Sequence, residues 1–380
     1  MKILIQIPQL IFGGAEKVLV SFANDLVSRG HDVTVLETYE KGLLKDQFDK
    51  RVKFDAICSK AYTKKYYASL ADVKKNPLLL GKLIFSKIVG YEKFAQKLCS
   101  KKYTNKKFDI AINYLEIENP KFLLNSIKAK KYIQWYHTDV ANLDHPEDAD
   151  KMLDSWKRMD AIICVSKISY ENFINRYNDL KDKTYLIYNF FDSQEIEKKS
   201  QESFIFETTK PVLLSVGRMT EPKKYLRFLK VIKKLCNEGY EFSWHVLGNG
   251  IQKGEIEQKI KDYNLENIVY LDGLTDNPYK YMKNCDLFVL PSGWEGFPTV
   301  TVEAKVLKCP ILATDVAGIR EQIVHGETGW IVDNNEDSIY NGLKHLLENP
   351  QIIKKIKDNS GIEKIVDSNI KYKEFMDVCK

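Results

Sequence analysis

The sequence predicts an α/β protein with two domains, each a doubly wound parallel sheet with helices on both faces. Short apolar runs alternate with helical patterns along the chain, which is typical of β-α-β units. The chain has 380 residues, enough for two domains, and a polar stretch at residues 192–210 interrupts the alternation and is interpreted as a linker. In open sheets of this kind, ligands bind beside the carboxyl ends of strands, and we expect a cleft between the domains.

The first domain is expected over residues 1–190. It opens with a strand at 3–7, a Gly-Gly turn and an amphipathic helix from Ala15 to Ser28. Further strands are predicted at 33–36, 110–114, 132–136, 161–165 and 185–188. Helical patterns separate these runs, and this alternation implies that the strands pair in parallel.

The second domain is expected over residues 191–360. Its first strand lies in PVLLSVGR, at residues 211–218. Later strands are predicted at 244–247, 268–271, 287–290, 311–313 and 330–332, with helices at 225–238, 253–263 and 337–348. A C-terminal helix at about 361–380 is expected to pack back on the first domain.

Composition narrows the class of protein. Apolar residues make up 44% of the chain and charged residues 29%, as in ordinary globular proteins. The seven cysteines are scattered without CxxC spacing, so neither a disulfide framework nor a zinc site is predicted. The apolar N-terminal run is too short for a signal peptide, and no window approaches a spanning helix. We therefore expect a cytoplasmic protein.

The net charge of +6 is unevenly distributed. Residues 60–107 contain thirteen lysines and two acidic residues, a local balance of +11, which leaves −5 for the rest. The segment also carries an apolar helical pattern, in which Leu79, Leu83, Ile84 and Ile88 would share one face. Two interpretations stay open. The segment could bind the inner face of an anionic membrane. Alternatively, it could form a helical hairpin that covers the first sheet, with its lysines in solvent. Nucleic acid is not expected as a partner, because arginine and known binding motifs are lacking.

Two loops at predicted strand ends suit anionic ligands. Gly13 and Gly14 open a helix, where backbone can approach a phosphate or sugar, although a plain βα turn also favours glycine. The three-glycine spacing of dinucleotide sites is missing. Arg218 and Lys223 follow the strand of PVLLSVGR and could converge on a polyanion, although ordinary surface charge explains them equally well in isolation.

The third loop is PSGWEGFPTVTVEA, residues 291–304, which places Glu295 in a Gly/Pro turn and Glu303 on the helix that follows. Pro298 suits the first turn of that helix, predicted from Thr299 to Leu307. The two carboxylates could act as general acid and base, as in sugar hydrolysis, or could accept hydrogen bonds from ligand hydroxyls. Two surface glutamates are the plainer alternative, which the apolar and turn-forming neighbours disfavour.

These residues form a recognisable set. The run NCDLFVLPSGWEGFPTVTVEAKVLKCPILATDVAGIREQIVHGETGWIV resembles retaining glycosyltransferases of family 4, with Glu295 and Glu303 as the Glu-x7-Glu motif. VGRMTEPKK matches the Gly-Arg…Lys loop of that family, VLGNG its Gly-Asp-Gly turn, and GGAEKVLVSFANDLVSRGHDV its N-terminal signature. The resemblance is dense over residues 211–350, clear over 1–40 and thin over 45–130, where such enzymes vary with their acceptors.

The resemblance implies the GT-B fold, two facing Rossmann-like domains with the donor held mainly by the second. It assigns catalytic roles to Arg218 and Lys223, which would neutralise the donor diphosphate, to Glu295, which would bind the donor sugar, and to His137 beside that sugar. Glu303 would bind the ribose. The donor-binding set is completed by Gly13, Gly14, Gly248, Gly296 and the residues at the helix start, Phe297, Thr299 and Val300.

The reaction implied is metal-independent transfer of a hexosyl group, with retention, from a nucleotide-diphosphate sugar. UDP is the favoured nucleotide, and no cofactor is expected. The acceptor would be a saccharide or lipid-linked hydroxyl in the synthesis of a bacterial surface glycan, such as capsule or lipopolysaccharide. Two rivals remain: a nucleotide-sugar epimerase of the same fold, and a non-catalytic sugar-binding partner subunit.

Two features depart from the family or from the fold. Lys224 stands where the family usually has glycine, and we expect this to make the loop more basic and less tight. Asp148-Ala149-Asp150 resembles the metal motif of the other glycosyltransferase fold. Because it follows Pro146 at a predicted helix start, we interpret it as capping chemistry and predict no metal site.

Overall fold

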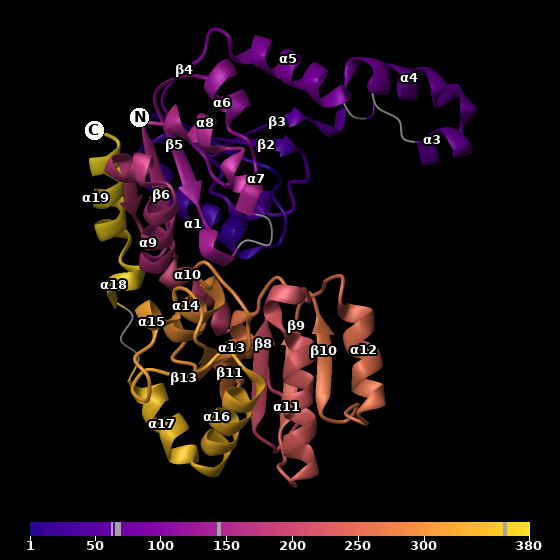
Figure 1. Ribbon diagram of the computed structural model, residues 1–380, viewed down its shortest axis with the longest axis vertical. Helices are drawn as coiled ribbons and strands as arrows, with labels where there is room; N and C mark the ends of the chain where they lie inside the picture. Colours follow the sequence, from indigo (N-terminus) through magenta and orange to yellow (C-terminus); the bar gives the residue numbers. More distant parts are fainter. Residues whose placement is uncertain (62–63, 65–69, 143–145, 360–362) are drawn as a thin grey trace. The chain divides into compact units, whose positions relative to one another are not determined.

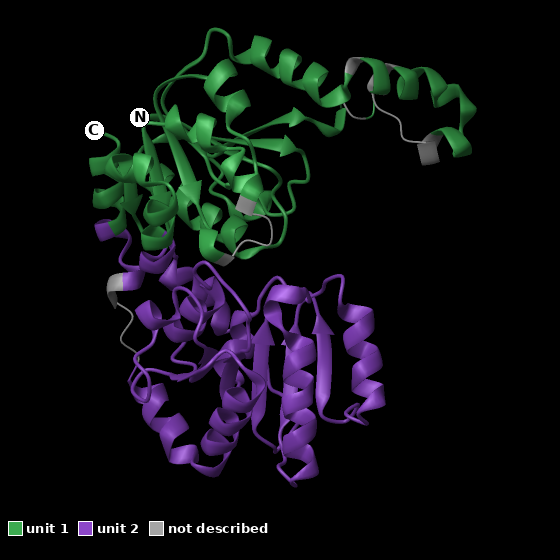
Figure 2. Cartoon of the chain, in the orientation of Figure 1, with its two compact units in different colours: residues 1–165, 170–189, 371–380 green, residues 166–169, 190–370 purple. Residues whose placement is uncertain are grey.

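The computed structural model describes residues 1–61, 64, 70–142, 146–359 and 363–380. The chain forms two compact units: unit 1 comprises residues 1–165, 170–189 and 371–380, and unit 2 comprises residues 166–169 and 190–370 (Figure 2). Each unit contains one parallel sheet, which confirms the α/β class. Among the described residues, no helix combines the length and apolar character needed to cross a membrane.

Unit 1 is built on a seven-stranded parallel sheet of order β3-β2-β1-β4-β5-β6-β7 (Figure 1). Its strands are β1 Lys2–Ile7, β2 Asp32–Tyr39, β3 Lys53–Cys58, β4 Lys107–Asn113, β5 Lys128–Tyr136, β6 Ala161–Cys164 and β7 Thr184–Leu186. Every strand predicted for this half is present. The edge strand β3 was not predicted. It contains two charged residues, and only its last three residues are buried, so its sequence lacks a clear apolar run.

Helices cover both faces of this sheet, which is why Ile3, Leu4 and Ile5 of the central strand β1 are fully buried. The helices of this half of the chain and of its C-terminus are α1 Gly14–Ser28, α3 Leu70–Lys75, α4 Leu80–Val89, α5 Tyr91–Tyr103, α6 Lys121–Ser126, α7 Pro146–Asp150, α8 Leu153–Lys157, α9 Lys167–Arg176 and α19 Ser368–Val378, and all but α3 and α4 lie against the sheet. Short 3₁₀ helices occur at η1 Lys45–Gln47, η2 Pro77–Leu79, η3 Val140–Asn142 and η4 Asn178–Lys183.

The C-terminal helix α19 contributes residues 371–380 to unit 1. Phe375 is fully buried, with its ring 5.2 Å from that of Phe22 and 6.0 Å from that of Trp135. The Tyr372 hydroxyl lies 2.9 Å from Nε2 of His31, and the Lys371 ammonium donates to the carbonyl of Asn189. The end of the chain is therefore part of the core of unit 1.

The lysine-rich segment contains one helix that covers the sheet and two that do not. Helix α5 packs on the sheet through Ala95, Cys99 and Tyr103, as a covering helix would. Helices α3 and α4 extend away from the sheet in Figure 1. The predicted shared face is wrong: Leu79 belongs to η2 and Leu83 is buried, whereas Ile84 and Ile88 are exposed. Residues 62–63 and 65–69 of the segment lie outside the described residues.

Asp148 and Asp150 lie in helix α7, and only the first occupies the position at the helix start that was predicted for the pair. Asp148 lies in the first turn of α7. Asp150 is the last residue of this short helix, and its carboxylate accepts hydrogen bonds from the guanidinium of Arg176 and, at 2.8 Å, from the Tyr177 hydroxyl. The second aspartate therefore anchors α9 to α7.

Unit 2 is built on a six-stranded parallel sheet of order β10-β9-β8-β11-β12-β13. Its strands are β8 Val212–Val216, β9 Ser243–Leu247, β10 Val269–Gly273, β11 Leu287–Leu290, β12 Ile311–Thr314 and β13 Trp330–Val332. All six predicted strands of this half are present. The strand order reverses at β8, between β9 and β11, which is the kind of switch point where open α/β sheets bind ligands.

The helices of unit 2 are α10 Ser193–Ser200, α11 Tyr225–Asn237, α12 Lys253–Asp262, α13 Tyr279–Asn284, α14 Thr299–Val306, α15 Ile319–Gln322, α16 Glu336–Glu348, α17 Pro350–Asp358 and α18 Glu363–Val366, with a 3₁₀ turn, η5, at Glu221–Lys223. Helix α10 corrects the prediction of a linker at 192–210. The side chain of Asp192 caps it by accepting from the amide of Glu195, and Ile196 joins a hydrophobic core of unit 2. The polar composition reflects a half-exposed helix.

We predict that Phe375→Ala lowers the free energy of unfolding of unit 1 by about 3–5 kcal/mol, because it leaves a cavity among aromatic rings. Ile370→Ala, on the same helix at a side chain that is 46% exposed, should cost less than about 1 kcal/mol. Urea unfolding followed by circular dichroism measures both. Equal losses for the two variants would contradict the docking of α19.

Candidate active site

The predicted site residues follow the carboxyl ends of strands in both units. In unit 2, Arg218 and Lys223 follow β8, Gly248 follows β9, and Glu295 to Glu303 follow β11. In unit 1, Gly13 and Gly14 follow β1, and His137 follows β5. Because the strands of each sheet are parallel, each set gathers along one edge of its own sheet.

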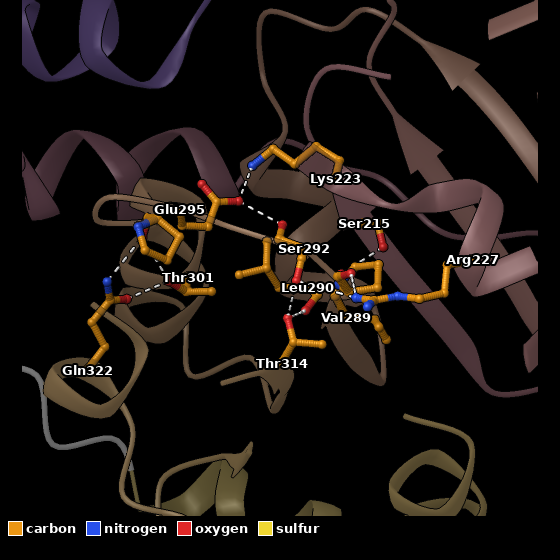
Figure 3. Close-up of polar contacts among 12 residues, drawn as sticks. Ser215, Lys223, Arg227, Val289, Leu290, Ser292, Glu295, Thr301, Thr314 and Gln322 are labelled. Carbon is orange, nitrogen blue, oxygen red and sulfur yellow. Dashed lines mark hydrogen bonds and ion pairs between the residues drawn. The ribbon is translucent and has the colours of Figure 1, made fainter. Parts of the chain in front are cut away.

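Lys223 and Glu295 are brought into direct contact. The Lys223 ammonium lies 2.6 Å from Oε1 of Glu295, and the two side chains are only 17% and 14% exposed (Figure 3). Ser292 donates its hydroxyl to the same carboxylate oxygen at 2.7 Å. A residue predicted to bind phosphate and one predicted to bind sugar are therefore partners in the structure.

The turn that carries Glu295 is held by the buried Thr314 and the half-buried Arg227 (Figure 3). Thr314 donates to the carbonyl of Ser292 at 2.6 Å, and Arg227 donates to the carbonyl of Pro291 at 2.7 Å. The amide of Gly293 donates to the carbonyl of Pro222 at 2.7 Å, which ties this turn to the Lys223 loop. Both loops are thus held in one geometry.

Arg218 differs from Lys223 in being exposed, and among the described residues its side chain has no ion pair or hydrogen bond. Lys224 makes the loop more basic, as expected, but the contacts of Lys224 do not fit the expectation of a less tight loop. Lys224 adopts the left-handed conformation at φ 52°, pairs with Glu221, and places its ammonium 5.1 Å from the ring centre of Trp294. This extra cation tightens the loop and leaves Arg218 as its unpaired charge.

Position 248 requires glycine for steric reasons. Its φ is 152°, and an added Cβ would lie 1.9 Å from the carbonyl oxygen of Gly217. The loops after β8 and β9 can approach this closely only through glycine. In contrast, a Cβ at Gly13 would meet the tip of the Glu16 side chain, which can move. Local packing therefore requires Gly248 but does not by itself require Gly13.

Helix α14 presents free backbone donors. It begins at Thr299, after Pro298, as predicted, and among the described residues no side chain caps its N-terminus. Gly296 and the buried Phe297 precede it and pack against Gly318, where a Cβ would lie 2.9 Å from the Phe297 ring. The amides of Thr299 and Val300 belong to the first turn, which is the arrangement that binds anions.

Glu303 lies on α14 and is buried, with 4% of its surface exposed. Tyr279, at the start of α13, hydrogen-bonds this carboxylate, and burial followed by the charge of Glu303 raises the pKa of Tyr279. The tyrosine therefore stays protonated and orients Glu303. Residue type and spacing alone gave no sign of this partner.

In unit 1, Glu37 holds the loop before Gly13. Its buried carboxylate accepts hydrogen bonds from the amides of Leu10 at 3.0 Å, Lys41 at 2.9 Å and Gly42 at 3.0 Å. This carboxylate at the end of β2 joins the loops after β1 and β2, and so positions the Gly13-Gly14 turn. It was not among the predicted site residues.

His137 is held as a neutral ring. Its amide donates to the Glu116 carboxylate at 3.0 Å, and its ring lies 4.8 Å from that of Tyr114. Burial lowers the pKa of His137 to about 3, against a smaller opposite effect of a hydrogen bond to the backbone of Tyr114. Nε2 is buried without a hydrogen-bond partner among the described residues. On a neutral ring this nitrogen can accept a hydrogen bond.

The supporting residues Ser292, Thr314, Arg227 and Glu37 were not predicted, and all but Ser292 act through contacts with residues distant in sequence. Only Ser292 left a local signal, since it lies within the PSGWEG turn three residues before Glu295. Among the described residues, no group of three or more histidine, cysteine, aspartate or glutamate side chains could hold a metal ion.

Comparison with known proteins identifies the class. A family model described as Glycosyltransferase Family 4 matches residues 12–195, and one described as Glycosyl transferases group 1 matches residues 196–361. The two models together cover residues 12–361, and the chain belongs to the family 4 type of glycosyltransferases.

Curated relatives match over part of their length. One is the N-acetylgalactosamine-N,N'-diacetylbacillosaminyl-diphospho-undecaprenol 4-alpha-N-acetylgalactosaminyltransferase of Campylobacter jejuni, 31% identical over 54% of this chain and 55% of that protein. Another is the amylovoran biosynthesis glycosyltransferase AmsD of Erwinia amylovora, 25% identical over 50% of this chain and 46% of the relative. The matched region thus spans about half the length of these relatives.

Solved structures match the whole chain. S. aureus TarM, in complex with Fondaparinux, alpha-GlcNAc-glycerol and UDP, superposes with a TM-score of 0.79 at 14% identity, covering 100% of this chain and 99% of that one. HepE of Anabaena, in complex with UDP and glucose, gives a TM-score of 0.74 at 18% identity, covering 99% and 98%. These likenesses confirm the predicted GT-B fold.

The lowered pKa of His137 predicts a pH dependence of stability. The unfolded ring takes up a proton below about pH 6.5 and the folded ring only near 3, so the free energy of unfolding should fall as the pH drops through this window. The contribution of this one group is at most about 1.4 kcal/mol per pH unit.

The free energy of unfolding, measured with urea at several pH values between about 3 and 6.5, tests this pH dependence. His137→Gln should flatten the dependence, whereas His345→Gln, at an exposed ring of α16, should leave it unchanged. Identical slopes for the wild type and His137→Gln would show that the ring is not held neutral.

Proposed function

We propose that the chain is a retaining, metal-independent glycosyltransferase that moves a sugar from a nucleoside-diphosphate donor, with UDP favoured, to a hydroxyl of a saccharide or lipid-linked acceptor. The observation that carries this proposal is the contact between Lys223 and Glu295 in unit 2. Glu295 shortly precedes the uncapped start of α14, and the exposed Arg218 lies on the same loop as Lys223. Cations and free amides suit a diphosphate, and a carboxylate suits sugar hydroxyls.

In the proposed reaction, the bond between the anomeric carbon and the β-phosphate oxygen breaks. The bond to the acceptor oxygen forms on the same face of the sugar, and the acceptor proton passes to the departing phosphate oxygen. Charge grows on the phosphate as the bond breaks, so Arg218 and Lys223 stabilise the transition state more than the bound donor. Arg218, Lys223 and the helix start would neutralise this charge without a metal ion.

The relatives support a role in making cell-surface polysaccharide. The Campylobacter relative is named for a diphospho-undecaprenol acceptor and the Erwinia relative for amylovoran biosynthesis, while the two structural neighbours were solved with UDP. We infer for this chain a saccharide acceptor, free or lipid-linked, and a UDP-sugar donor.

We predict that Arg218→Ala lowers kcat/KM for sugar transfer by about 10²–10³-fold, as loss of one transition-state donor does elsewhere. Activity is measured as release of UDP from UDP-sugars in the presence of a saccharide panel, with and without EDTA. Arg51→Ala, at an exposed arginine paired with Asp49 in unit 1, is the matched control. Turnover of Arg218→Ala within twofold of wild type would refute the charge role.

The same assay separates the two rivals. An epimerase converts the nucleotide sugar when acceptor is omitted, and a non-catalytic subunit binds it without turnover. Conversion of the donor to an isomer without acceptor, or donor binding with no transfer to any acceptor, would replace the transferase proposal.

We further propose that the exposed part of the lysine-rich segment binds an anionic membrane surface. Leu78 and Ile88 are 92% and 78% exposed, and Leu80 and Ile84 are 50% and 47% exposed. Lysines flank them at 74, 75, 82 and 87. Apolar side chains that enter the headgroup region beside lysines that face lipid phosphates are typical of interfacial helices. Such binding would bring the enzyme to a lipid-linked acceptor.

Sedimentation with vesicles of phosphatidylglycerol and phosphatidylcholine tests this surface. Wild-type binding should weaken from about 0.1 M to about 1 M salt, because salt screens exposed charges. Leu78→Ser with Ile88→Ser should weaken binding about tenfold or more. Leu274→Ser, at a 65% exposed side chain of unit 2, should have no effect. Wild-type binding that is absent, or that is equal with neutral vesicles, would refute the proposal.

A further inference from the structure

The ion pair between Lys223 and Glu295 has a feature that the proposed function does not explain. If Lys223 binds the donor diphosphate and Glu295 binds the donor sugar, the two side chains need not touch. In the structure they do, at 2.6 Å, with both side chains more than four-fifths buried. The carboxylate thus occupies the coordination position on Lys223 that an anionic ligand would take.

The contact is built into the loops and is not a chance meeting of two surface side chains. Ser292, which is fully buried, donates to the same Oε1 that Lys223 contacts. Thr314 and Arg227 fix the backbone on which Ser292 and Glu295 stand. On the other side, the amide of Gly293 donates to the carbonyl of Pro222, the residue before Lys223. Both partners are held to this distance before any ligand arrives.

A partly buried lysine that lost its anion would be left uncompensated, which is unfavourable. Glu295 provides that anion in the ligand-free site. A diphosphate bound on Lys223 would place a second negative charge beside the carboxylate, and like charges repel. Arg218, exposed and without an ion pair among the described residues, is free to contact the diphosphate first.

We propose that Glu295 and the donor diphosphate exchange places on Lys223. In the free enzyme the carboxylate holds Lys223, the arriving diphosphate replaces it, and Glu295 is then released to accept hydrogen bonds from the sugar hydroxyls. Sugar recognition would therefore follow diphosphate recognition, and a ligand without the second phosphate would leave Glu295 paired. This inference rests on the proposed function and adds a specificity role for Glu295 in selecting diphosphates.

The exchange predicts that loss of the Glu295 carboxylate increases the affinity for UDP. Glu295→Gln removes the competitor for Lys223, so it should bind UDP more tightly than the wild type, by about tenfold, while transferring sugar more slowly. A carboxylate that served only the sugar would leave UDP affinity unchanged, because UDP carries no sugar beyond its ribose. The effect must act through Lys223, and it should vanish in a Lys223→Met background.

Isothermal titration calorimetry with UDP and with uridine 5′-monophosphate on the full-length chain tests this with four proteins: wild type, Glu295→Gln, Lys223→Met and the double variant. Initial transfer rates are measured on the same preparations, and thermal melts show that each is folded. The expected result is tighter UDP binding by Glu295→Gln, a smaller change for the monophosphate, and no gain when Lys223 is Met.

Glu303→Gln is the matched carboxylate control on α14 and should not tighten binding. Unchanged or weaker UDP binding by Glu295→Gln, or an equal gain in the Lys223→Met background, would overturn the exchange and leave the proposed function intact. If wild-type protein bound neither UDP nor GDP and transferred no sugar, the proposed function itself would fail, which is a separate outcome.

Discussion

The contact between the Lys223 ammonium and the Glu295 carboxylate joins the two loops on which the proposed donor site depends. It pairs a cation from the loop after β8 with an anion from the turn after β11, and both stand on backbone held by further hydrogen bonds. Because the charges are mostly shielded from solvent, the pair is sensitive to any third charge nearby. A site arranged in this way can respond to an anionic ligand by exchanging partners, without a large movement of the chain.

The sheet of unit 2 makes that contact possible. β8 lies between β9 and β11, so the loops that follow these strands emerge side by side at one edge. Gly248 lets the loop after β9 press against Gly217, while Thr314 at the end of β12 and Arg227 on α11 hold the turn after β11. Buried carboxylates hold the loops of unit 1 in a similar way. Glu37 joins the loops after β1 and β2, and Glu116 accepts a hydrogen bond from the backbone amide of His137.

Local pattern was enough to predict most of the fold. Runs such as Leu287–Leu290 are apolar because both faces of a parallel sheet are covered, and Pro298 marks the start of α14. Prediction failed where polar residues are half buried: β3 was missed, and α10 was interpreted as a linker although Ile196 anchors it. The identities of Arg218, Lys223, Glu295 and Glu303 came from motif spacing. Of the side chains that support them, Ser292 lies in the same turn as Glu295. Thr314 and Tyr279 act through contacts between elements distant in sequence, which no local pattern encodes.

The central claim is that Lys223 changes partner when a nucleoside diphosphate binds. A crystal structure of the chain with UDP tests it most directly, through the distances from the Lys223 ammonium to Glu295 and to the β-phosphate. We predict that the ammonium lies within hydrogen-bond distance of a β-phosphate oxygen and that Glu295 has moved out of contact. A structure with UDP bound in unit 2 and the ion pair still at the ligand-free distance of 2.6 Å would contradict this claim.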